Sequence, residues 1–171
     1  MLKVLIPKEM GAETRVAGSP DTVRALAKRQ LLCVVEKGAG TASGFSDEQY
    51  SAAGAELASP QDSAVWAEAN LLLTVGPLQL EQPKLSAGAL VVGQLAPHVK
   101  ENLLQLLQGK NLSAISLELL PRISRAQSMD VLSSQANIAG YKAVLLAANR
   151  YQRFFPMLMT AAGTVKAARV V

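Results

Sequence analysis

Short apolar runs alternate with amphipathic stretches through the first 120 residues of the chain. The runs at 31–35, 71–75 and 89–93 are apolar without alternation, which is typical of strands that are covered on both faces. Between these runs, apolar positions recur with the period of a helix. We therefore expect strands over 3–7, 31–35, 55–58, 70–77, 89–95 and 112–119.

Two of the expected helices carry clear start signals. Ser19 is placed to cap a helix over 19–30, because its side chain can accept a hydrogen bond from an unpaired backbone N–H group. Ser46 and Gln49 have the spacing of a capping box at the start of a helix over 46–54. Both signals predict where the chain leaves a loop and becomes helical.

Two further helices complete the alternation with the strands. We expect one over 59–69, capped by Ser59, and one over 99–111. The second has an apolar face made of three leucines, Leu103, Leu104 and Leu107. Strands that alternate with helices imply parallel strands joined by right-handed crossovers. The pattern therefore predicts a doubly wound α/β domain with a mostly parallel sheet.

The pattern changes to a sustained helical period over 133–150. One face of this expected helix collects the apolar side chains Ile138, Tyr141, Val144, Leu145 and Ala148. Gly140 interrupts it at a cost of about 1 kcal/mol relative to alanine. We interpret this glycine as a place where another backbone packs closely. Beyond the helix, the aromatic and methionine residues around 154–159 are expected to pack in a core or a domain interface.

Charge is spread unevenly along the chain. Residues 1–120 carry ten basic and twelve acidic groups, whereas residues 121–171 carry seven basic and one acidic group, which gives a net charge of +4. A basic segment of this kind is compatible with nucleic acid, anionic lipid or a phosphate-bearing cofactor. Without interleaved aromatic residues or a recognisable nucleic-acid motif, nucleic-acid binding is disfavoured. No apolar run is long enough for a transmembrane helix, and the first residues do not have the pattern of a signal peptide.

Few residues are candidates for nucleophilic or metal chemistry. The single cysteine, Cys33, lies in an apolar run and is expected to be buried. The single histidine, His98, follows Pro97 and is expected to be exposed and non-catalytic. One cysteine and one histidine provide no metal-ligand spacing, so no metal site is predicted.

A polar loop over 121–132 stands between the last expected strand and the long helix. It contains Arg122, Gln127 and Asp130, and Ser133 follows it. On composition alone, the favoured interpretation is that Arg122 and Asp130 pair and cap the helix.

The residues of this loop also carry a resemblance to a known family. The stretches PRISRAQSMDVLSSQANIAGYKAV at 121–144 and NRYQRFFPMLMTAAGTVKAARVV at 149–171 resemble the soluble alpha subunit of proton-translocating NAD(P) transhydrogenase. Earlier motifs, IPKE at 6–9, ETRVAGSP at 13–20 and GFSDEQYSAAGAE at 44–56, are similar to alanine dehydrogenase as well. The resemblance covers essentially the whole chain, and its loop motif is specific to transhydrogenases.

The resemblance implies a function and a set of site residues. In that family this subunit binds NAD(H), a second component binds NADP(H), and a hydride passes directly between the two nicotinamides, coupled to proton movement through a membrane component. The family's catalytic loop residues fall here on Arg122, Gln127 and Asp130, and the cofactor-binding residues fall on Arg122, Asp130 and Ser133. Because hydride transfer needs two rings held close, residues that position the rings matter more than acids or bases. The resemblance also implies a homodimer in the cytoplasm, peripheral to the inner membrane through its NADP-binding and membrane partner components.

The same resemblance sets the expected domain boundaries. Residues 1–132 form a Rossmann-like α/β domain that includes the polar loop, residues 133–164 form a helical connector, and residues 165–171 begin a strand of a second, absent NAD-binding domain. The glycine fingerprint for the cofactor pyrophosphate is expected after that strand. The glycine-rich stretch at 38–44 lacks the fingerprint's spacing and is expected to be a tight turn. We therefore expect the isolated chain to be inactive.

Two other functions stay open. In an alanine dehydrogenase, Arg15 would match a substrate-carboxylate arginine, but Val75 and Gln94 replace the expected lysine and histidine, which disfavours that activity. Arg15 then needs another role, such as a salt bridge with Glu9 or Glu13. The second alternative is a non-catalytic dimerisation or docking module, with the basic C-terminal third as its interface.

Overall fold

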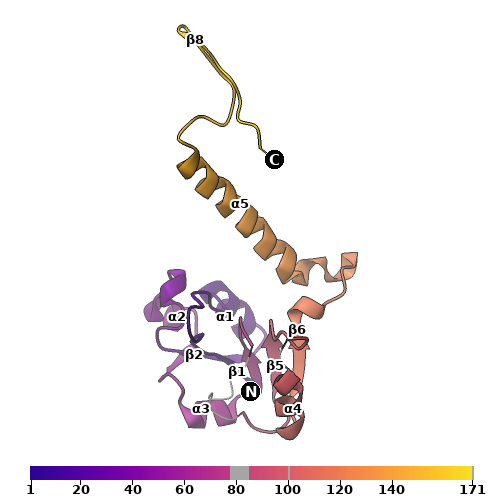
Figure 1. Ribbon diagram of the computed structural model, residues 1–171. Helices are drawn as coiled ribbons and strands as arrows, with labels where there is room; N and C mark the ends of the chain where they lie inside the picture. Colours follow the sequence, from indigo (N-terminus) through magenta and orange to yellow (C-terminus); the bar gives the residue numbers. More distant parts are fainter. Residues whose placement is uncertain (78–84, 100, 171) are drawn as a thin grey trace. The chain divides into compact units, whose positions relative to one another are not determined.

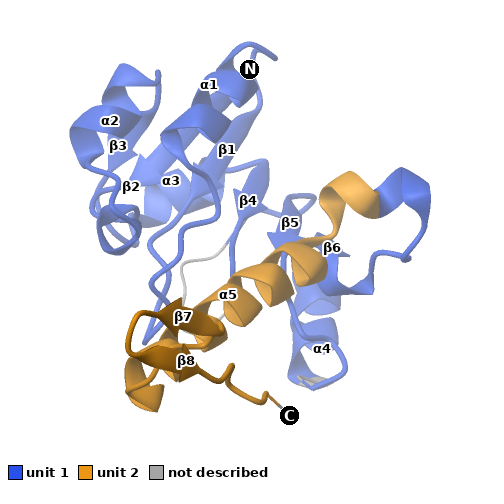
Figure 2. Cartoon of the chain, turned by 90° about the horizontal axis from the view of Figure 1, so that it is seen from above, with its two compact units in different colours: residues 1–126 blue, residues 127–171 orange. Residues whose placement is uncertain are grey.

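The computed structural model describes residues 1–77, 85–99 and 101–170. The chain forms two compact units, Met1–Ala126 and Gln127–Val171, which Figure 2 colours separately. We call them unit 1 and unit 2, and each is described by itself.

Unit 1 contains a sheet of six parallel strands in the order β3-β2-β1-β4-β5-β6. The order grows outward in two directions from the pair β1 and β4, so the sheet has a switch point between these strands. The predicted doubly wound, Rossmann-like fold is confirmed (Figure 1). The strands are β1 (Lys3–Ile6), β2 (Leu32–Glu36), β3 (Glu56–Ala58), β4 (Leu71–Leu73), β5 (Leu90–Gly93) and β6 (Ser113–Ser116).

Helices pack against both faces of this sheet and bury two hydrophobic clusters. The helices are α1 (Pro20–Ala27), α2 (Asp47–Ala52), α3 (Ser63–Glu68) and α4 (Glu101–Gly109). Successive strand residues enter opposite clusters, as the alternation of side chains along a strand requires. Val4 and Cys33 pack with α1 and α2, whereas Leu5 and Leu72 pack with Trp66 of α3. The expected burial of Cys33 is confirmed, and this burial raises the pKa of its thiol.

The helix starts agree with the sequence at two positions and differ at a third. Ser19 and Ser46 cap α1 and α2 through capping boxes, as predicted. Helix α3 is capped by Asp62 and not by Ser59, because the chain first turns and Asp62 then accepts a hydrogen bond from the backbone N–H of Ala64 at 3.0 Å.

The apolar face of α4 is narrower than expected. Leu103 and Leu107 are buried, whereas Leu104 is 59% exposed. Adjacent residues of a helix point about 100° apart, so Leu104 turns away from the sheet when Leu103 faces it. The expected strand over 112–119 is also shorter, because the chain turns into a 3-10 helix, η2 (Leu117–Leu119), directly after β6. Further 3-10 helices are η1 (Thr41–Ser43) and η3 (Ser124–Met129).

Unit 2 consists of a long helix, α5 (Val131–Tyr151), and a β hairpin of β7 (Leu158–Thr160) and β8 (Gly163–Val165). The helix expected over 133–150 is confirmed. The hairpin lies inside the span that the sequence assigns to a helical connector, and residues 166–170 form no strand although one is expected over 165–171. A hairpin forms because Gly163, at φ 126, completes a turn that pairs Thr160 with Gly163. Residues 166–170 form no strand because a strand needs a neighbouring strand for its backbone hydrogen bonds.

The apolar side chains of unit 2 are mainly exposed. On α5, Ile138, Tyr141 and Val144 are 60%, 69% and 60% exposed. A Cβ added at Gly140 would meet no atom within 4 Å, so no other segment of unit 2 packs against this glycine. In the segment beyond α5, Phe154, Met157 and Met159 are exposed, so they do not form the core that we considered. Tyr151 stacks on Phe155, with ring centroids 5.5 Å apart.

Among the residues that the structure describes, we find no helix with the length and apolar character that a membrane crossing requires.

Candidate functional site

The polar loop leads into α5 through Asp130, which caps the helix. Its Oδ1 atom accepts a hydrogen bond from the backbone N–H of Ser133 at 3.0 Å, and its Oδ2 atom accepts one from the Ser133 hydroxyl at 2.6 Å. The Asp130 carbonyl also accepts the first backbone hydrogen bond of α5, from the N–H of Ser134 at 3.4 Å. Both carboxylate oxygens of Asp130 are thus engaged, and they fix the side chain of Ser133.

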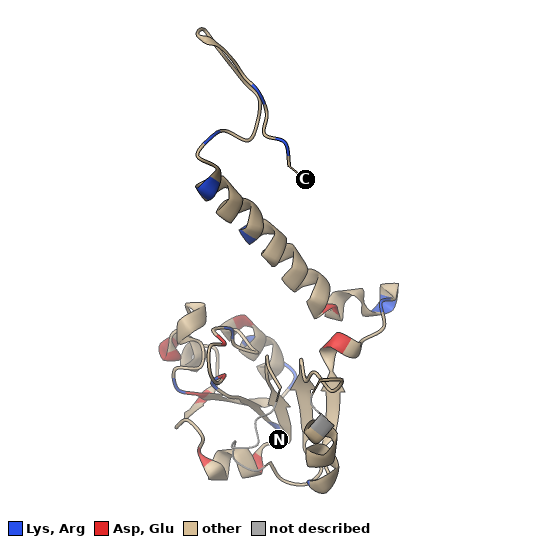
Figure 3. Ribbon diagram, viewed as in Figure 1, with Lys and Arg blue, Asp and Glu red and all other residues tan. Residues whose placement is uncertain are grey.

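The other two predicted site residues have exposed side chains. Arg122 is exposed in unit 1, and Gln127 is exposed in the first turn of unit 2. The backbone between them is held by local hydrogen bonds, because the N–H of Ala126 donates to the Ile123 carbonyl at 2.9 Å and the N–H of Asp130 donates to the Gln127 carbonyl at 3.3 Å. The structure brings Asp130 and Ser133 together, and it leaves the guanidinium of Arg122 and the amide of Gln127 accessible. Basic residues outnumber acidic ones along unit 2 (Figure 3).

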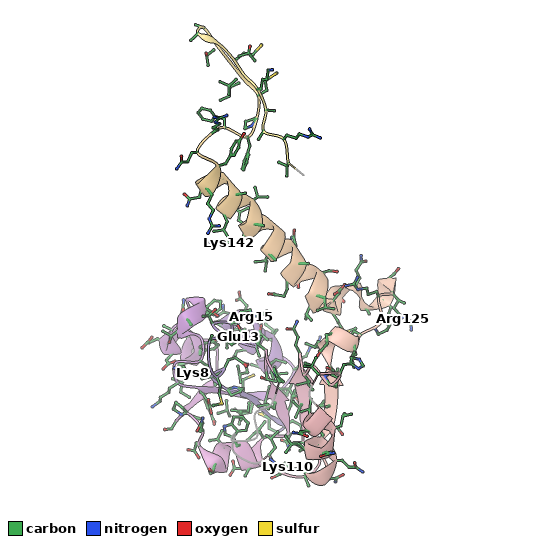
Figure 4. The ribbon with its side chains drawn as sticks, in the orientation of Figure 1. Lys8, Glu13, Arg15, Lys110, Arg125 and Lys142 are labelled. Atoms are coloured by element: carbon green, nitrogen blue, oxygen red, sulfur yellow. The ribbon has the colours of Figure 1, made fainter. Side chains whose placement is uncertain are left out.

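Arg15 forms the salt bridge with Glu13 that we considered. Its Nη2 atom lies 2.7 Å from Glu13 Oε2, and its Nε and backbone N–H groups both donate to Oε1 at 2.9 Å (Figure 4). This guanidinium holds the pKa of the Glu13 carboxyl at about 2, well below its usual value. Arg15 therefore has a partner on its own loop. His98 is exposed, as predicted.

A second polar cluster lies at the carboxyl ends of β1 and β4, and our sequence reasoning did not find it. Glu9 Oε1 accepts a hydrogen bond from the backbone N–H of Val75 at 2.6 Å, and Oε2 accepts one from Gly76 at 3.3 Å. The Thr74 hydroxyl lies 3.1 Å from Oε1. The available signal was position: Glu9 and Thr74 each follow a strand beside the switch point.

The glycine-rich stretch over 38–44 is a tight turn that the chain fills itself. The N–H of Gly38 donates to Asp47 Oδ1 at 2.8 Å. A Cβ added at Gly40 would fall 2.6 Å from Cε2 of Tyr50, so an aromatic ring occupies the space against this turn. The stretch therefore does not present a free backbone cradle for a cofactor pyrophosphate, in agreement with our prediction.

Comparison with known proteins places this geometry in a family. The family model described as "Alanine dehydrogenase/PNT, N-terminal domain" matches residues 5–139. The chain belongs to this family. It is 42% identical over 172 residues to the NAD(P) transhydrogenase subunit alpha of Cereibacter sphaeroides, covering 99% of this chain and 33% of the relative.

A solved structure and a second relative separate the two branches of the family. The crystal structure of transhydrogenase from Sinorhizobium meliloti matches with a TM-score of 0.87 and 43% identity, over 97% of this chain and 48% of that chain. The alanine dehydrogenase of Staphylococcus haemolyticus is 31% identical over 90% of this chain and 40% of the relative. This member of the alanine dehydrogenase/PNT family therefore resembles transhydrogenases more closely than that dehydrogenase. It spans between about a third and a half of the length of these relatives.

Proposed function

We propose that this chain is the N-terminal domain of the NAD(H)-binding subunit of an NAD(P) transhydrogenase, which transfers a hydride between NADH and NADP+. The observation that carries the proposal is similarity to transhydrogenase alpha subunits over 99% of the chain, including the polar loop. The replacement of the expected dehydrogenase lysine and histidine by Val75 and Gln94 disfavours the alanine dehydrogenase alternative.

The polar loop supplies groups that suit a nicotinamide. The exposed guanidinium of Arg122 offers a planar set of donors for a carboxamide oxygen. Gln127 has both a donor and an acceptor, and its exposed side chain is suited to reach a partner's cofactor. Asp130 fixes the side chain of Ser133 through the two hydrogen bonds described above, which supports our assignment of Ser133 to the nicotinamide site. When bound, the nicotinamide pair supplies the hydride chemistry itself, and these residues hold and orient it.

The rest of the cofactor site is assigned to a second domain. The turn over 38–44 is filled by Tyr50 and Asp47, so we place the pyrophosphate-binding fingerprint outside this chain. We therefore expect calorimetric titration of the 171-residue chain with NADH to show no binding. Micromolar binding would contradict this placement of the cofactor.

Substitutions in the complete transhydrogenase test the loop. Arg122→Ala and Asp130→Asn should each lower the rate of hydride transfer, by about 100-fold if the ring is displaced by about 1 Å. Arg125→Ala is the matched control, because Arg125 is an exposed arginine of the same loop that we assign no role. Unchanged hydride transfer in the two test variants, or an equal loss in the control, would refute the assignment.

Partners and location follow from the same proposal. We assign this domain to the cytoplasmic side of the inner membrane, bound there through the NADP-binding and membrane components, with proton translocation occurring in the membrane component. We expect the chain to bind membranes that contain those components and to resist proteolysis there. It should not bind membranes that lack them.

One observation favours the second candidate function, a self-association module. The α5 side chains Ile138, Tyr141 and Val144 are exposed on a helix that contains no buried residue from Val131 to Tyr151. Exposed apolar faces of this kind mark interaction sites. Sedimentation of the chain should therefore show a homodimer, and Tyr141→Lys should weaken it. A monomer at high concentration argues against self-association through α5.

A further inference from the structure

The polar loop starts beside the segment that follows β5. In the parallel register of β5 and β6, Gly93 pairs with Ser116, so the segments that leave the two strands begin side by side (Figure 1). Residues 94–96 continue from β5, and η2 continues from β6. Arg122 comes only three residues after η2, which makes η2 the last element before the polar loop.

Glu118, in η2, connects these two segments. The backbone N–H of Ala96 donates a hydrogen bond to Glu118 Oε1. The segment after β5 is itself well anchored, because the side chain of Leu95 is buried in the core and the N–H of Gln94 donates to the Val75 carbonyl at 3.2 Å. The Glu118 carboxylate therefore ties the start of the polar loop to the core of unit 1.

The connection is made at two local costs to stability. Ala96 has φ 50, in the left-handed region that residues other than glycine rarely adopt. Within the described parts of the chain, Glu118 Oε2 and Ser116 Oγ are both buried atoms without a hydrogen-bond partner. Such atoms lower stability, and departures of this kind concentrate at functional sites. Their coincidence marks this junction as one where position matters more than stability.

The polar loop itself adds little to fix the direction in which Arg122 leaves η2. The side chains of residues 121–125 are all exposed, and the next buried side chain is that of Ala126. The N–H of Ile123 donates to the Pro121 carbonyl at 2.9 Å, a bond that closes a turn within the loop without attaching it to the sheet. The place of the Arg122 guanidinium thus depends on how η2 is held against the end of β5.

We propose that Glu118 is a positioning residue for hydride transfer, which sets the place of Arg122 by tying η2 to the segment after β5. This inference rests on the proposed function, because Arg122 is assigned there to the nicotinamide site. Glu118 acts only through Arg122 and does not touch the cofactor. A displacement of about 1 Å can lower a rate about 100-fold, so a small shift of η2 is enough.

The experiment is a double-mutant cycle in the complete transhydrogenase, with Glu118→Ala, Arg122→Ala and the variant that carries both changes. The kcat of hydride transfer and the KM for NADH are measured for each. Glu118→Ala should lower kcat by about 10-fold to 100-fold. Its KM should change little, because the pyrophosphate is assigned to another domain. The double variant should lose no more than Arg122→Ala alone, since Glu118 acts through Arg122.

Two further variants serve as rescue and control. Glu118→Gln should recover most of the rate, because its amide oxygen still accepts from the Ala96 N–H and its amide nitrogen can donate to the Ser116 hydroxyl. Glu68→Ala, which removes an exposed carboxylate elsewhere in unit 1, should leave kcat unchanged.

The outcomes distinguish this inference from the proposed function. Additive losses in the double variant overturn the inference, because Glu118 would then act by a path other than Arg122. A normal kcat in Glu118→Ala beside a reduced one in Arg122→Ala also overturns it and leaves the proposed function standing. An unchanged rate in Arg122→Ala overturns both. If Glu118→Ala does not fold, Glu118→Asp carries the same test with a side chain too short for the Ala96 N–H, and full activity there overturns the inference.

Discussion

Unit 1 and unit 2 are both rich in apolar residues, but they bury them to different degrees. In unit 1, Leu5 and Leu72 are almost fully buried in the sheet, with Trp66 packed against the same cluster. In unit 2, α5 has no buried residue from Val131 to Tyr151, although it has a row of apolar side chains and is capped by Asp130. Local signals are therefore enough to define a helix, whereas burial depends on distant segments that come to cover it.

The largest expected effect comes from the same substitution made once in each unit. Leu72→Ala should lower the free energy of unfolding by about 2 to 5 kcal/mol, because Leu72 is 0% exposed and its loss leaves a cavity. Leu145→Ala, at a position 46% exposed on α5, should change it by less than about 0.5 kcal/mol. Urea denaturation of both variants measures the difference.

Equal losses would show that α5 is buried in the protein in solution. A concentration-dependent loss in Leu145→Ala alone would place its cover in a second copy of the chain and support the self-association candidate.

A smaller effect is expected from the buried carboxylate of Glu36 at the end of β2. Its Oε1 atom accepts hydrogen bonds from the N–H of Gln61 at 2.7 Å and from Trp66 Nε1 at 2.9 Å, and Oε2 accepts one from the N–H of Lys8 at 2.9 Å. Glu36→Gln replaces one acceptor by a donor that faces another N–H group, so it should cost about 2 kcal/mol. Chemical denaturation checks this, with Glu68→Gln as the exposed control.

A loss in Glu36→Gln no larger than in the Glu68→Gln control would mean that water or a shift of the loops replaces the lost acceptor. The hydrogen bonds from Lys8, Gln61 and Trp66 to Glu36 would then contribute little to the stability of unit 1.

The smallest effect concerns the pH dependence of the Glu13–Arg15 pair. The folded pKa of Glu13 is about 2, against an ordinary value of 4.5, so the pair stabilises the fold above pH 4.5 and loses its effect as the pH falls towards 2. Because Arg15 is 44% exposed, solvent screening limits this contribution to about 1 kcal/mol or less. The difference in unfolding free energy between wild type and Glu13→Gln should therefore shrink between about pH 6 and about pH 2.5. A difference that is constant across this range would contradict the assignment.

The sequence predicted the elements of unit 1 well, because strand and helix signals in it are strong and local. The unbroken apolar run around Cys33 predicted a buried strand, and the capping residues Ser19 and Ser46 predicted two helix starts. The hairpin over 158–165 was missed, because its strands are only three residues each and β8 begins with a glycine. The cap of α3 was also misplaced, because Ser59 and Asp62 are both good capping residues and only the path of the chain selects Asp62.

For the candidate site, the sequence identified residue types but not their partners. Asp130 and Ser133 lie three positions apart at a helix start, which is a local relation that a sequence can reveal. The acceptors of the Val75 and Gly76 N–H groups lie 66 and 67 positions away at Glu9, and no periodicity encodes this distance.

The sequence by itself determined the alternation of strands and helices in unit 1, the caps of α1 and α2 and the resemblance to transhydrogenases, because all three depend on neighbouring residues. The tertiary structure alone decided that Glu36 and Glu9 are held by N–H groups from distant loops, and that Ile138 is exposed. The physical reason is that burial and the pairing of buried polar groups depend on which segments meet in space. Parallel strands bring together residues that are separated by dozens of positions along the chain.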